Sequence, residues 1–210
     1  MRKLYWIIEG LKMDAAIFAA SFVYSFLIAS QKLAEGGWMQ VMQMGAIYTL
    51  VMGGAMMLIS SVNLYWLHVP LALMFSSTRK ETYIGLQYYR LAIAVPVLLV
   101  SSIMCTMTYP EFRANTWMVV VLGMSAFMIL GGIGGILGYI CYKLSKAALM
   151  GIMLFTLFLV IILVTAMTIG FAVFLKIADS AIWIVFGVGI FVHIIGNVME
   201  YKRIKGFCVR

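Results

Sequence analysis

The chain has 210 residues, of which 65% are hydrophobic and 10% are charged, and its formal net charge at pH 7 is +8. A soluble domain carries about 25% charged residues, so this composition excludes an ordinary soluble globular fold. The basic residues stand in short gaps between apolar runs. This placement indicates membrane topology signals and contacts to anionic lipid, not a nucleic-acid-binding face. We therefore expect an integral membrane protein.

The first thirteen residues differ in character from those that follow. Leu4, Ile7, Ile8 and Leu11 recur at the spacing of one helix face, and the charged residues lie largely on the other side. Such a pattern is typical of an amphipathic helix in the membrane interface, so it predicts an elbow helix over residues 1–13. The alternative is that these residues simply extend the first membrane-spanning helix.

Six apolar segments are long enough to cross a membrane, which takes about 20 residues of helix. Helices are expected because each one satisfies its own backbone hydrogen bonds in lipid. The predicted spans cover residues 14–30, 45–67, 91–109, 117–142, 147–175 and 181–199. The predicted fold is all-α, with six transmembrane helices in a single transmembrane domain over residues 1–210.

The distribution of basic residues orients these spans. An even number of spans places both termini on one side of the membrane. If that side is the cytoplasm, only Lys32, Arg113 and Lys176 of the 15 Lys and Arg residues fall outside. This is the bias that the positive-inside rule describes. We expect a multi-pass protein of the cell membrane with both termini in the cytoplasm.

The cytoplasmic segment over residues 68–90 connects the second and third predicted spans. Pro70 is suited to the end of one helix or the first turn of the next. Thr78 and Glu81 have the three-residue spacing of a capping box, which opens a helix. We expect a short helical piece, a Ser/Thr-rich turn, and a second helix that leads into the third span. A structured cytoplasmic element of this kind suggests a docking surface.

The chain lacks the common motifs of nucleotide binding and hydrolysis. GxxxxGK[ST], HExxH and GxSxG are all absent from the sequence. The run GGIGGILG lies within the fourth predicted span, where Gly131/Gly135 and Gly134/Gly138 form small-xxx-small pairs. These pairs favour close helix packing over ligand binding. No catalytic or metal site is predicted, and the chain is not expected to be an enzyme by itself.

Polar residues inside the predicted spans are few. Asn63 lies in the second span, and His193 and Asn197 lie one helical turn apart in the sixth. They are candidates for a cargo path, and the alternative is an interhelical hydrogen bond. No Asp or Glu falls firmly in the middle of a span, which weakens the interpretation as an ion-coupled transporter. The cysteines have no CxxC spacing and are expected to pack as small apolar residues: Cys105, Cys141 and Cys208.

The segment over residues 68–90 resembles the small permease subunits of ABC-2-type transporters. These often carry a Pro-Leu-Ala-Leu…Phe-Gly-Ser-Thr-Arg-Lys-Glu-like stretch after their second span. Here the stretch is PLALMFSSTRKE, with Ser76 where glycine is usual. The resemblance implies an elbow helix, six spans, and a coupling segment that contacts an ATPase. The residues that it assigns to docking are Pro70, Phe75, Ser76, Ser77, Thr78, Arg79, Lys80 and Glu81.

The resemblance also implies partners and a function. Two ABC ATPase subunits would hold ATP and Mg, since this chain holds no cofactor, and a second permease chain, identical or related, would complete the pathway in the lipid bilayer. The implied function is export of an apolar or amphipathic cargo, such as an antimicrobial peptide or a lipid-like compound. Three alternatives stay open: an ATP-independent channel or secondary transporter, a membrane-embedded enzyme, and a non-transporting immunity or sensor subunit.

Overall fold

The computed structural model describes residues 2–30, 33–64, 68–74, 78–108, 116–143, 151 and 179–206. Within these ranges the elements are all helical, as predicted. They are α1 (Arg2–Ser30), α2 (Leu33–Asn63), α3 (Val69–Met74), α4 (Arg79–Thr108), α6 (Thr116–Lys143) and α8 (Asp179–Lys205).

Among the described residues, four helical segments are long and apolar enough to cross a membrane. They are Gly37–Val62, Arg79–Thr108, Trp117–Gly138 and Ala181–Lys205. They correspond to the second, third, fourth and sixth predicted spans, so the chain is a multi-pass membrane protein. The first predicted span is helical within α1 but is not among these four, and the fifth, residues 147–175, lies almost entirely outside the described residues. The count of six spans therefore remains a prediction.

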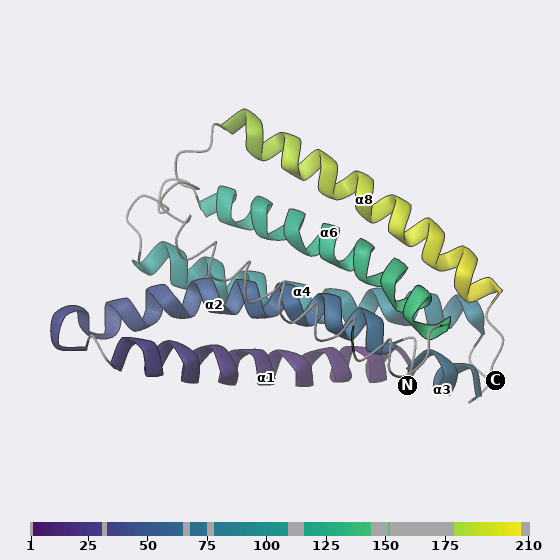
Figure 1. The fold of residues 1–210 in the computed structure, drawn as a ribbon, viewed down its shortest axis with the longest axis horizontal. Coiled ribbons are helices and arrows are strands. Elements are labelled where there is room, and N and C mark those ends of the chain that lie inside the picture. The colour runs from purple at the N-terminus through teal and green to yellow at the C-terminus, as the bar shows by residue number, and fades with distance from the viewer. Residues whose placement is uncertain are drawn as a thin grey trace.

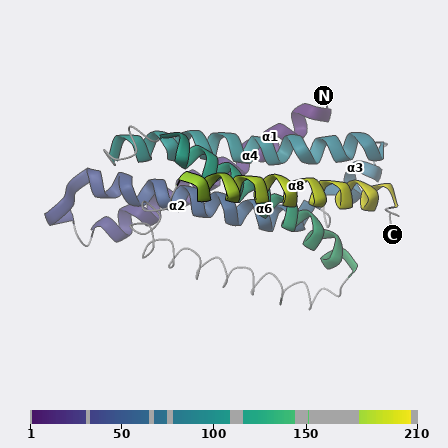
Figure 2. The same cartoon turned by 90° about the horizontal axis from the view of Figure 1, so that it is seen from above.

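The long helices run side by side as an elongated bundle (Figures 1 and 2). α2 packs against α1, α4 and α6, while α8 lies along α6 and also touches α4. The start of α1, the short helix α3 and the end of α8 lie at the same end of the bundle (Figure 1). We call this the α3 end.

The α3 end is also the basic end of the bundle. Every Lys and Arg of the described ranges lies in the half of its helix that is nearer to the α3 end: Arg2, Lys3, Lys12, Arg79, Lys80, Arg90, Lys143, Lys202, Arg203 and Lys205. The three basic residues expected outside lie beyond the described ranges. The concentration of positive charge at one end agrees with the predicted charge bias, and the assignment of that end to the cytoplasm stays a prediction.

Residues 2–13 are not a helix of their own, contrary to the prediction of a separate elbow helix over residues 1–13. α1 runs from Arg2 to Ser30 without a break, so these residues are continuous with the helix that contains the first predicted span. The physical reason is that Trp6 is buried against α4, where a Cβ at Gly85 would overlap its indole ring. This contact binds the first turns of α1 to the bundle. The predicted apolar stripe, represented by Leu4 and Leu11, lies exposed on the outside of the bundle, where an interfacial helix would face lipid.

Glycines set the spacing between α6 and its neighbours. A Cβ at Gly134 would lie 2.8 Å from the Ser61 Cβ on α2, which confirms the prediction of close packing for this residue. The closest approach to a backbone atom is one that the sequence did not suggest. A Cβ at Gly196 of α8 would lie 2.6 Å from the Gly132 Cα of α6. Backbones can approach this closely only where neither residue carries a side chain.

Candidate functional site

The predicted segment over residues 68–90 contains α3 and the first turns of α4, and its docking residues lie between the start of α3 and the first turn of α4. Pro70 is the second residue of α3, so it stands in the first turn, where proline is well tolerated. Phe75, Ser76 and Ser77 lie outside the described residues. Thr78 precedes α4 directly, and Thr78, Arg79, Lys80 and Glu81 are all exposed at the α3 end. The start of α4 therefore presents a polar, predominantly basic surface, beside the exposed apolar side chains of Leu71 and Met74 on α3.

Thr78 and Glu81 form the predicted capping box. The Thr78 backbone N–H donates to Glu81 Oε2 at 2.9 Å, and the Glu81 backbone N–H donates to Thr78 Oγ1 at 3.2 Å. These reciprocal bonds satisfy two donors that a helix start would otherwise leave unpaired. The capping box fixes the position at which α4 begins.

The start of α1 contacts the start of α3. The Tyr5 hydroxyl lies 3.1 Å from His68 Nδ1, and the Trp6 and His68 rings lie 5.9 Å apart. Burial lowers the pKa of His68 because desolvation disfavours the charged imidazole, while nearby Glu9 acts in the opposite sense. His68 is therefore a neutral residue at pH 7 that joins the N-terminal turns to the docking segment.

A buried ion pair joins α4 to α8. Arg90 Nη1 and Nη2 donate to Glu200 Oε2 and Oε1, each at 2.7 Å, in a bidentate arrangement. Both residues are almost fully buried, at 4% and 1% exposure. Such burial is tolerated only when the charges are paired and hydrogen-bonded. This pair is the strongest electrostatic feature among the described residues.

Further polar groups surround the pair from three helices. Arg90 Nε donates to Ser61 Oγ of α2 at 3.4 Å, and Gln87 Nε2 lies 3.1 Å from Asn197 Oδ1 and 3.3 Å from Glu200 Oε2. On α6, a Cβ at Gly135 would lie 3.1 Å from both Arg90 Nη2 and Glu200 Oε1. The absence of a side chain there makes room for the pair. We call Arg90, Glu200, Gln87, Asn197 and Ser61 the polar network.

The polar network lies where the predicted spans meet the α3 end. Arg90 directly precedes the third predicted span, and Glu200 directly follows the sixth. The part of α4 beyond Arg90 rises about 27 Å, close to the thickness of a bilayer core of about 30 Å. On the predicted spans, which begin at residue 91 and end at residue 199, the network stands near one border of the hydrocarbon region, where α4 passes from the docking segment into its predicted membrane-spanning part.

Asp14 is a second buried acidic residue. Its side chain is 3% exposed on α1, and neither carboxylate oxygen has a hydrogen-bond partner among the described residues. The Ser21 hydroxyl, two turns further along α1, is likewise buried without a partner there. A carboxylate in this setting is costly unless it is neutralised or binds something, and in membrane proteins such residues are often functional.

The predicted cargo-path residues are only partly brought together. Asn63 is the last residue of α2, and its side chain is not among those described. Asn197 belongs to the polar network through its hydrogen bond with Gln87 of α4, which is the interhelical bond named as the alternative. His193 is half-buried towards α6, where its ring contacts the Met128 backbone. The two α8 residues thus face different neighbours.

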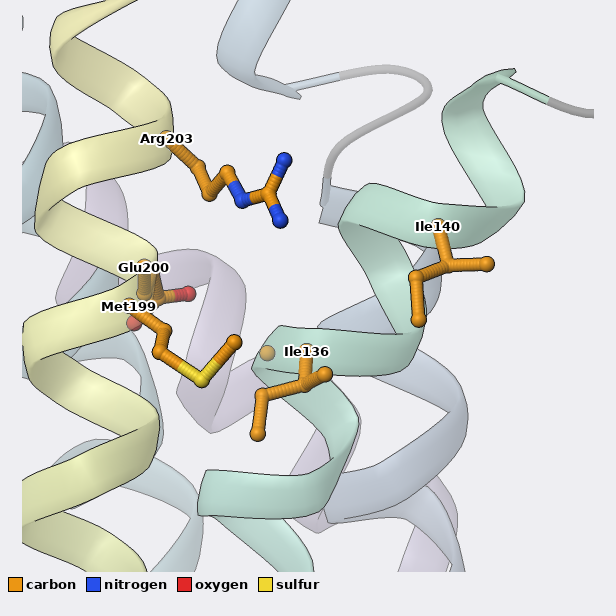
Figure 3. Close-up of a pocket in the computed structure, with 6 residues that line it drawn as sticks. Ile136, Ile140, Met199, Glu200 and Arg203 are labelled. Atoms are coloured by element: carbon orange, nitrogen blue, oxygen red, sulfur yellow. The ribbon is translucent and has the colours of Figure 1, made fainter.

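A small pocket lies beside the ion pair, between α6 and α8. It has a volume of about 50 Å³ and is lined by Gly135, Ile136, Ile140, Met199, Glu200 and Arg203. Figure 3 shows the Arg203 side chain reaching from α8 towards α6, and Met199 pointing towards Ile136. The pocket is too small for a drug-sized ligand, so we regard it as a packing gap next to the polar network.

The sequence did not suggest the ion pair or the burial of Asp14. In the sequence, Arg90 is one of the basic residues expected in the cytoplasm, and Glu200 lies just beyond the last predicted span. The available signal was that opposite charges stand at the same border of two predicted spans.

Comparisons with protein-family models, with curated proteins and with solved structures give no match for this chain.

Proposed function

We propose that the chain is the transmembrane permease subunit of an ABC exporter, which moves an apolar or amphipathic cargo with ATP hydrolysed by a separate ATPase subunit. The observation that carries this proposal is the docking segment. A short helix, α3, and a capped, exposed, basic helix start stand together at the end of the bundle that collects the positive charge. A partner ATPase could bind this surface from the cytoplasm.

The structure of α4 offers a path from docking to transport. Arg79 and Lys80 stand in its first turn, and Arg90 follows about three turns later on the same helix. Because Arg90 is paired with Glu200, movement of the α4 start would also act on α8. In the proposal, ATP-driven closure of two ATPase subunits pushes on the docking segment and rearranges these helices. A second permease chain, identical or related, completes the cargo path.

Binding of an ATPase tests the docking surface directly. In co-expression with candidate ATPases, the double substitution Arg79→Glu/Lys80→Glu should abolish co-purification of the ATPase with the detergent-solubilised chain. The single change Lys80→Glu should weaken it, whereas Lys205→Glu should not. Lys80 and Lys205 are both exposed at the α3 end, but Lys205 ends α8. ATPase binding that is unaltered by the double charge reversal would refute docking at this turn.

A second candidate is an ion-coupled secondary transporter, and Asp14 favours it. A buried carboxylate without a partner among the described residues is the kind of group that carries protons or cations across membranes. In proteoliposomes that contain the chain alone, cargo flux driven by an ion gradient and abolished by Asp14→Asn would support this candidate. Flux that requires ATP and an ATPase would support the exporter.

A further inference from the structure

A groove between α4 and α8 opens at the α3 end of the bundle. It has a volume of about 320 Å³, at the small end of the range of about 300–1,000 Å³ that ligand pockets occupy. Its lining residues come from both helices: Tyr83, Ile194, Asn197, Val198, Tyr201 and Lys202. The Tyr83 and Tyr201 rings meet edge to face, with their centroids 5.2 Å apart.

The lining changes character along α8. Ile194 and Val198 present apolar surface, at 56% and 49% exposure, on the membrane side of the groove. Tyr201 and Lys202 follow within the next turn, towards the α3 end. Tyrosine is enriched at the border between membrane and water, where its ring sits at the level of lipid headgroups. The groove therefore offers an apolar wall followed by a polar, cationic mouth.

The charge at the mouth is positive. Lys202, in the last turn of α8, has no carboxylate partner among the described residues. The acidic residue nearest in sequence, Glu200, is buried in its ion pair with Arg90. An anion that approaches the mouth thus meets a cation without meeting an exposed carboxylate from the groove lining.

We propose that this groove binds an anionic phospholipid, with its phosphate at Lys202 and one acyl chain against Ile194 and Val198. Basic sites between transmembrane helices near the membrane border are suited to anionic headgroups. A free phosphate could pair with Lys202, but it would leave the apolar wall of the groove uncovered. The combination of a cation and an apolar wall therefore favours a lipid. This inference does not depend on an ATPase partner and stands or falls separately from the proposed function.

Native mass spectrometry of the purified chain can test the proposal. The protein is incubated in detergent with equal amounts of phosphatidylglycerol and phosphatidylcholine, and the lipids that stay bound are counted. We expect phosphatidylglycerol to be retained preferentially. Lys202→Gln should lower its apparent affinity about fivefold, the effect of one basic residue near an anionic surface. Lys205→Gln removes the same charge from the same turn but does not line the groove, so it should leave the affinity unchanged.

The apolar wall has its own matched pair of variants. Val198 and Val188 are both on α8 and both 49% exposed, but only Val198 lines the groove. Val198→Trp should displace the retained phosphatidylglycerol, and Val188→Trp should not. Equal losses in the two lysine variants, equal losses in the two tryptophan variants, or displacement of the lipid by millimolar inorganic phosphate alone would each overturn the proposal.

Discussion

Arg90 on α4 and Glu200 on α8 are held in a bidentate ion pair whose side chains are 5% and 0% exposed, although 110 positions separate them in the sequence. Arg90 lies about three turns after the exposed start of α4, and Glu200 lies close to the end of α8. It therefore ties the helix that leaves the docking segment to the last helix of the chain. Both the stability of the bundle and the proposed transmission of movement depend on this contact.

Breaking the pair from either side should destabilise the protein strongly. We expect Arg90→Leu or Glu200→Leu alone to lower stability by about 3–5 kcal/mol, because each leaves an uncompensated buried charge. The double variant Arg90→Leu/Glu200→Leu should recover much of this loss, since no unpaired charge remains. Thermal unfolding of the four proteins in the same detergent measures the coupling. Strictly additive losses in the double variant would show that the two side chains do not act as a pair.

The close approach of α6 and α8 should make Gly196 intolerant of any side chain. A Cβ there would lie 2.6 Å from the Gly132 Cα, so Gly196→Ala should force the helices apart and destabilise by about 1–3 kcal/mol. Gly187→Ala is the matched control, because nothing lies within 4 Å of its Cβ position on the same helix. Its effect on the melting temperature should be small. Equal melting temperatures for the two variants would contradict the packing described for these helices.

Removing the charge of Asp14 should stabilise the protein. Its carboxylate is buried without a hydrogen-bond partner among the described residues, so Asp14→Asn, which keeps the shape and removes the charge, should raise the melting temperature. A fall in the melting temperature of the Asp14 variant would mean that the carboxylate makes a stabilising interaction.

His68 should make stability depend on pH. Burial lowers its pKa below the ordinary value of about 6.5, so the folded protein binds fewer protons at this site than the unfolded chain. Its stabilising contribution is therefore present above pH 6.5 and is lost as the pH falls through the lowered pKa. When the pH is lowered from 7.5 to 5, the melting temperature should fall more for the wild type than for His68→Gln. An identical fall in the two proteins would exclude His68 as the titrating group.

The sequence predicted features that local pattern determines. The four apolar segments with matching long helices were recognisable from composition, because each must satisfy its own hydrogen bonds and present apolar side chains to lipid. The capping box at Thr78 and Glu81 was recognisable because its three-residue spacing is itself the geometry of the contact. These features do not depend on which helix packs against which.

The remaining features depend on contacts between distant helices. Arg90 and Glu200 each resemble an ordinary charged residue at the border of a span, and only the packing of α4, α6 and α8 buries them together. The same holds for Trp6. It lies in the stretch predicted to form an interfacial helix, yet the missing side chain at Gly85 creates the space that buries it. Periodicity in a single helix contains no information about such partners.

Co-purification tests the central claim, that this chain is a permease driven by a separate ATPase. The tagged chain is co-expressed with the products of its neighbouring genes and purified in detergent, and the retained proteins are identified by mass spectrometry and assayed for ATP hydrolysis. The account predicts that an ABC ATPase is retained and is lost on Arg79→Glu/Lys80→Glu. A chain that purifies without any ATPase, and that moves its cargo in proteoliposomes without ATP, would contradict it.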